Sequence, residues 1–113
     1  MLAINARLIS DIVIFDMAGR FSFMEFKLHE QAKELLNAGS RKFILNLTDV
    51  SYVDSFGVGQ MFSIWTSMRA KGGNVVLLRP NDAVKKVLQS TRLDTVFEIF
   101  PDESAAITHL KSL

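Results

Sequence analysis

The sequence contains no cysteine among its 113 residues, which excludes disulfide bonds, thiolate catalysis and cysteine-ligated metals. It also lacks an excess of charge of one sign, since 13 basic residues are balanced by 12 acidic ones and the net charge is +1. A nucleic-acid surface needs clustered basic residues in excess, so this balance argues against one. No apolar run approaches the ~20 residues that cross a bilayer, and the N-terminus lacks the features of a signal peptide. These absences predict a cytoplasmic protein without membrane insertion.

Hydrophobic residues, in contrast, are plentiful. They make up 49% of the sequence and include nine phenylalanines and five methionines. This amount is sufficient for a substantial core, and the length fits one domain that spans residues 1–113. The phenylalanines and methionines either fill that core or leave an apolar surface for a partner protein.

Short apolar segments alternate along the chain with longer segments of helical periodicity. We expect strands at residues 2–9, 12–17, 43–47, 74–79 and 96–100. We expect helices at about 23–37, 55–70, 82–91 and 102–113, the last with Leu113 turned inward. The two-residue link Ser10-Asp11 suits a hairpin between the first two strands, and Gly19 is expected to end the second.

The first helix carries its own start signals. Ser22 and Glu25 have the spacing of a capping box, and Phe21 is placed to pack against Phe26 as a hydrophobic staple. Met24 then falls on the predicted inner face of the helix.

The resulting order is β-β-α-β-α-β-α-β-α. Strands that alternate with helices require crossover connections, which give a mostly parallel sheet. The opening hairpin adds an antiparallel strand at one edge. The sequence therefore predicts an α/β fold with a small mixed sheet of about five strands and about four helices.

The most informative stretch follows the strand at residues 43–47. A polar loop at residues 48–54 is expected to lead into a helix that begins at Ser55. Asp54 or Ser55 can serve as N-cap, because its side-chain oxygen accepts a bond from a free N–H of the first turn. Gly57 and Gly59 lie in that turn, where each glycine costs about 1 kcal/mol relative to alanine. They indicate a close approach, either by an element of this chain or by a partner.

The segment Val53-Asp-Ser-Phe-Gly-Val-Gly59, preceded by Leu45-Asn-Leu47, resembles the signature of STAS domains, and more closely that of the bacterial anti-sigma-factor antagonists. The element order is also that of a STAS domain, with helices mainly on one side of the sheet. In that family a partner kinase phosphorylates the serine that follows the aspartate. The resemblance therefore implies that Ser55 is the phosphoacceptor.

The resemblance implies a non-enzymatic switch without a cofactor or metal of its own. The unphosphorylated protein would bind an anti-sigma factor that is also an ATP-dependent serine kinase. Phosphorylation of Ser55 would release it, and a serine phosphatase would reset it. The residues implied in partner binding are Asp54, Ser55, Phe56, Gly57, Gln60, Phe21 and Ser22.

Two departures from the family pattern affect this surface. Phe56 stands where the family usually has a small hydroxyl residue. Arg20-Phe21 precedes Ser22 where family members often carry an acidic or hydroxyl residue, so the local charge has changed sign. Both departures bear on which partner is recognised.

Other functions remain open at this stage. The aspartate–serine pair is also an ordinary capping pair. A catalytic serine needs a base, and the only candidates are His29 and His109, both at helix-surface positions. Asp16, Asp49 and Asp54 follow or lie near strands, as in an aspartyl-phosphate receiver with Mg²⁺, but without a recognised ligand spacing. A STAS subunit of a lipid-transport complex or stress-sensing scaffold, and a ligand- or nucleotide-binding module, are further alternatives.

Overall fold

The computed structural model describes residues 1–22 and 24–113. The main elements follow the predicted order and form a five-stranded sheet in the order β1-β2-β3-β4-β5. β1 is antiparallel to β2, and the other neighbours are parallel. The elements are β1 Leu2–Ile9, β2 Ile12–Phe21, α1 Lys27–Asn37, β3 Lys42–Val53, α2 Ser55–Ala70, β4 Asn74–Leu78, α3 Asp82–Ser90, the 3₁₀ helix η1 Leu93–Thr95, β5 Ile99–Phe100 and α4 Glu103–Lys111.

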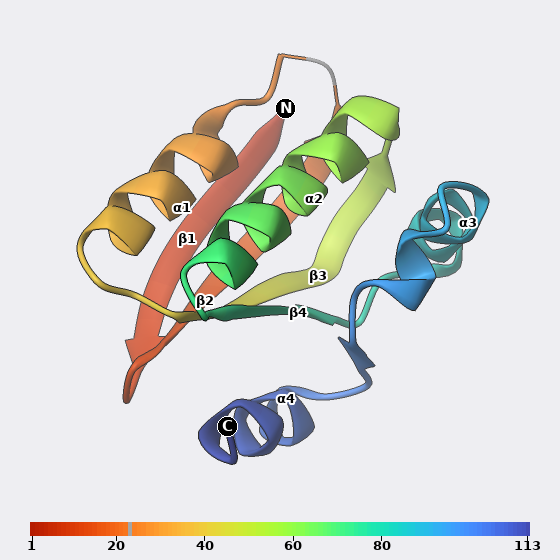
Figure 1. The fold of residues 1–113 in the computed structure, drawn as a ribbon. Helices are drawn as coiled ribbons and strands as arrows, with labels where there is room; N and C mark the ends of the chain where they lie inside the picture. The colour runs from red at the N-terminus through yellow and green to blue at the C-terminus, as the bar shows by residue number, and fades with distance from the viewer. Residues whose placement is uncertain (23) are drawn as a thin grey trace.

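Helices cover both faces of the sheet. α1 and α2 lie side by side on one face and α4 lies on the other (Figure 1). Successive side chains of a strand point to opposite faces. In β2, Val13 and Phe15 therefore join the larger core under α1, α2 and α3, whereas Ile12 and Ile14 pack on the α4 side. This two-sided burial explains why the central strands read as continuous apolar runs.

Two strands are longer than predicted. β2 does not end at Gly19 but continues to Phe21, with Gly19 at a φ of +103° beside a shift in strand register. β3 continues to Val53, so most of the expected loop is strand, with Val50 and Val53 buried. Irregularities of this kind leave residues unpaired and bend the strand, while pairing resumes beyond them. The paired ends of β2 and β3 carry the start of α2.

The predicted start of α1 is wrong. The helix begins at Lys27 after the N-cap Phe26, and no side chain caps it. Ser22 and Glu25 are joined only through the backbone, where the Glu25 N–H donates to the Ser22 carbonyl over 3.2 Å. Phe21 does not staple Phe26, because its side chain is fully buried in the core. Met24 precedes the helix and is 64% exposed.

The C-terminal part also differs from prediction. β5 contains only Ile99–Phe100, because the chain turns at residues 96–97, directly after η1, before it joins the sheet. Ala106 and Leu110 of α4 are buried, but Leu113, which was predicted to turn inward, lies beyond the helix and is exposed.

The helical spacing of Val58, Met61, Phe62, Trp65 and Met68 predicts that these residues form the buried side of α2, but the observed buried side is rotated from it. Phe62 is exposed, whereas Ile64 is buried because α2 packs against α1 as well as against the sheet. Val58, Met61 and Met68 face the core as predicted. In the described ranges, no helix is both long and apolar enough to cross a membrane.

Candidate functional site

Asp54 is the residue that starts α2. Its backbone is extended, with φ −98° and ψ −176°, and its Oδ1 accepts a hydrogen bond from the Gly57 N–H at 2.9 Å. Its carbonyl oxygen accepts from the Val58 N–H at 3.0 Å. The structure therefore decides between the two predicted caps in favour of Asp54. Ser55 becomes the first residue of the helix, and its hydroxyl is not needed for capping.

Ser55 is exposed at this helix terminus. In residues 1–22 and 24–113, no group forms a hydrogen bond with its hydroxyl. The first turn of a helix carries backbone N–H groups without helical partners, and the helix dipole favours negative charge there. The hydroxyl is thus accessible, and its surroundings tolerate an added anion.

Gly57 holds the first turn of α2 close to the end of β2. A Cβ at this position would collide with the Phe21 carbonyl oxygen and would lie 3.0 Å from Val53 Cγ1. The same carbonyl accepts a hydrogen bond from the Asp54 N–H at 3.3 Å. At Gly59, by contrast, a Cβ would meet nothing within 4 Å. Internal packing therefore explains the first glycine but not the second.

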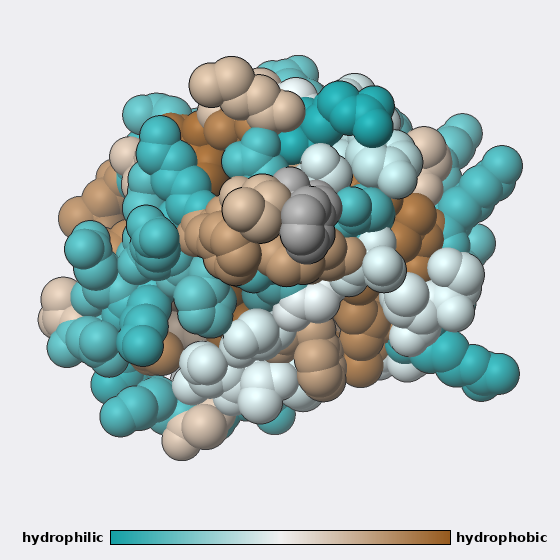
Figure 2. Space-filling view, turned by 90° about the horizontal axis from the view of Figure 1, so that it is seen from above, coloured by the Kyte–Doolittle hydropathy of each residue, from teal (hydrophilic) through white to brown (hydrophobic). Residues whose placement is uncertain are grey.

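Phe56 is half-buried and turned toward α1. Its ring meets that of Phe26 edge to face, with centroids 5.4 Å apart and planes at 89°. Phe26 is 45% exposed and Met24 is 64% exposed. Figure 2 looks down on this end of the molecule and shows apolar side chains gathered near its centre, among polar ones. We call Met24, Phe26 and Phe56 the apolar surface.

The sequence implicated Phe56 in partner binding but assigned Met24 and Phe26 other roles, so it missed those two parts of this surface. The expectation that Phe21 contacts a partner is corrected, because its side chain is fully buried.

Three other residues implied in partner binding lie near the start of α2. Ser22 is half-buried at the end of β2, and Gly57 is buried beneath the helix. Gln60 is half-buried, and its buried Oε1 has no hydrogen-bond partner among the described residues. Of the predicted contact residues, Ser55 is the one that is exposed, next to the half-buried Asp54 and Phe56.

The histidines do not build a catalytic site around Ser55. His109 lies on α4, on the opposite face of the sheet, with its Nε2 3.2 Å from Glu98 Oε2. His29 lies on α1 and lines a groove near the far end of α2. Neither donates to nor accepts from the Ser55 hydroxyl, so the structure shows no nucleophile–base pair there.

Asp16 is engaged in an ion-pair network rather than in a metal site. It accepts from Arg7 Nε at 2.6 Å and from the Asn46 amide at 2.7 Å. Arg7 also binds Glu103 of α4. Hydrogen bonding to Arg7 holds the pKa values of the Asp16 and Glu103 carboxyl groups below their usual range. Within the described parts of the chain, no group of three or more potential ligands could hold a metal ion.

Comparisons with known proteins agree with this geometry. The family model described as the STAS domain matches residues 3–106. A Thermotoga maritima protein, provisionally assigned as an anti-sigma factor antagonist, is 37% identical over 78 residues, which is 69% of each chain.

Solved structures show the same fold. A crystal structure of a Thermotoga maritima protein with the same provisional assignment has 30% identity and a TM-score of 0.88, covering 96% of this chain and 94% of the other. The anti-sigma factor antagonist SpoIIAA in its unphosphorylated form has 22% identity, a TM-score of 0.86 and 98% coverage of both chains. The family model spans most of this chain, which belongs to the STAS domain family.

Proposed function

We propose that this protein is a cytoplasmic anti-sigma factor antagonist whose binding is switched by phosphorylation of Ser55. Unphosphorylated, it binds an anti-sigma factor that is also a serine kinase. Phosphorylation releases it, and a serine phosphatase restores binding. The protein itself is not an enzyme, and ATP and Mg²⁺ belong to the kinase.

One observation carries this proposal, namely the exposed Ser55 hydroxyl at the first position of α2, bordered by the apolar surface. The hydroxyl is accessible to a kinase, and Met24 and Phe26 give a partner apolar area to bury. The Thermotoga maritima relatives, provisionally named as anti-sigma factor antagonists, support the same function. SpoIIAA has been solved in an unphosphorylated and a phosphorylated form, which fits a switch of this kind.

The physical effect of the switch acts outward. A phosphate adds about −1.5 to −2 charges. At a helix N-terminus these charges are tolerated by the dipole and the free N–H groups, so the fold of this chain changes little. In a complex, however, the dianion lies beside Asp54 against a partner. Even in bulk water, two unit charges 4 Å apart interact by about 1 kcal/mol, and desolvation at an interface adds to the cost.

The test is phosphorylation by a purified anti-sigma factor kinase with ATP and Mg²⁺, followed by peptide mapping and affinity measurement. We expect phosphate on Ser55 and a loss of affinity of at least tenfold. Ser55→Ala should abolish labelling and retain binding, and Ser55→Glu should weaken binding. Ser51→Ala is the matched control, because Ser51 is also exposed, four residues earlier, and should leave labelling unchanged. Phosphate on another residue, or full affinity after Ser55 is phosphorylated, would contradict the proposal.

A further inference from the structure

A groove separates α1 from α2 at the end of the helix pair away from Ser55. It has a volume of about 360 Å³, within the range of small-molecule sites. Its base includes Phe43 of β3 and Met68 of α2, both fully buried. Ser67 lies 12 residues after Ser55 on α2, which places the groove about 18 Å along the helix from the phosphoacceptor. The groove is therefore separate from the proposed switch.

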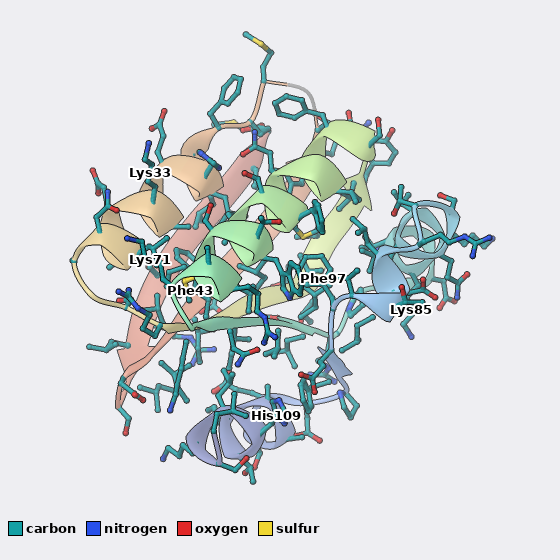
Figure 3. The ribbon with its side chains drawn as sticks, in the orientation of Figure 1. Lys33, Phe43, Lys71, Lys85, Phe97 and His109 are labelled. Carbon is teal, nitrogen blue, oxygen red and sulfur yellow. The ribbon has the colours of Figure 1, made fainter. Side chains whose placement is uncertain are left out.

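The charged groups that line the groove are all basic. Lys33 of α1 and Lys71, just after α2, are both exposed, and no aspartate or glutamate is among the lining residues. Figure 3 shows both lysines, with Phe43 on the face of the sheet that α1 and α2 cover. His29 also lines the groove, and its buried Nδ1 has no hydrogen-bond partner in the described part of the chain. An apolar base with cationic groups at the opening is complementary to a ligand with an apolar body and an anionic head.

We propose that the groove binds a free alkyl carboxylate of medium chain length. The volume of about 360 Å³ lies within the range of small-molecule sites, and we take decanoate, with about 12 non-hydrogen atoms, as a ligand of suitable size. The alkyl chain lies over Phe43 and Met68, and the carboxylate lies at the opening near Lys33 and Lys71. The proposal does not depend on Ser55 or on the kinase.

Decanoate is the probe for the full-length protein, followed by amide chemical shifts and by calorimetry. Typical ligand efficiencies place the dissociation constant of a 12-atom ligand at about 2 mM or below. We expect saturable shifts confined to the groove-lining residues of α1, from His29 to Asn37, to Phe43 of β3 and to the last turns of α2. Hexanoate should bind at least tenfold more weakly, since each methylene that leaves the groove costs about fourfold. Decylammonium, with the same chain and the opposite charge, should also bind at least tenfold more weakly.

Substitutions on the rim and in the groove give matched pairs. Lys33→Glu and Lys71→Glu should each weaken decanoate binding by about two- to fivefold, as expected for exposed charges. Lys85→Glu, on α3 outside the groove, should not change it. Ser67→Trp fills the groove and should abolish binding, whereas Thr66→Trp, next to it and outside the lining, should not. Thermal unfolding of each variant shows whether it is folded.

Three results would overturn the proposal. The first is the absence of saturable shifts at the groove. The second is equal affinity for decylammonium, which would mean that charge does not select the ligand. The third is unchanged binding by a folded Ser67→Trp variant, which would place the ligand elsewhere.

Discussion

Gly57→Ala tests the close contact between the start of α2 and the end of β2. The new methyl group would collide with the Phe21 carbonyl oxygen and crowd Val53 Cγ1 at 3.0 Å. The carbonyl is backbone and holds the Asp54 N–H, so it cannot move without losing that bond. Overpacking costs about 1–3 kcal/mol, the lost bond about 0.5–1.5 kcal/mol, and alanine returns about 1 kcal/mol of helix propensity. The variant should lose about 0.5–3.5 kcal/mol of unfolding free energy.

Gly59→Ala is the matched control, with the same side-chain change two residues later in the same helix. Its methyl group would meet nothing within 4 Å, so only the gain in helix propensity remains. We expect an increase of up to about 1 kcal/mol in the free energy of unfolding. Urea unfolding with equal slopes for all three proteins gives both values. In a thermal melt, each kcal/mol corresponds to about 4 °C for a chain of this size.

The test is whether Gly57→Ala has a lower free energy of unfolding than Gly59→Ala. If Gly57→Ala is as stable as Gly59→Ala, the first turn of α2 is not held against Phe21. The geometry that exposes Ser55 would then be wrong. If Gly59→Ala gains stability but loses affinity for the kinase, a partner rather than the fold requires that glycine.

Three further predictions concern the cap of α2, the ion pairs of Arg7 and the apolar surface. Asp54→Ala should cost about 1 kcal/mol in urea unfolding, because the Gly57 N–H loses its cap, whereas Asp54→Asn should keep most of it. Arg7→Met should destabilise the protein most near pH 7 in a urea series. The pKa values of Asp16 and Glu103 are lowered in the fold, so their stabilisation is present above the unfolded values and is lost as pH falls through the folded ones; a pH-independent difference between the proteins would refute this. Phe26→Ala should leave the melting temperature nearly unchanged but weaken kinase binding at least tenfold by calorimetry, as aromatic interface residues do; unchanged affinity would remove Phe26 from the interface.

Local sequence patterns predicted the helices and strands well where no long-range packing interaction opposed the pattern. The two-residue link before Ile12 predicted the hairpin, and the Asp54-Ser55 pair predicted the start of α2. At Ser22 and Glu25 the same kind of signal failed. The chain there follows the end of β2, and Phe21 is drawn into the core rather than onto the helix surface. A capping pattern competes with burial of a large aromatic side chain, and burial prevails.

The amino-acid sequence by itself determined the order of strands and helices, the family and the place of Ser55 at a helix start. These depend on residues that are near one another in the chain. Only the tertiary structure decided that Asp54 takes the cap, that Gly57 is required by Phe21, and that Met24 and Phe26 remain exposed. The groove between α1 and α2 likewise exists only after folding. The Asp54 cap is a local bond to Gly57, but the contact of Gly57 with Phe21 and the groove join segments distant in the sequence, which local periodicity does not encode.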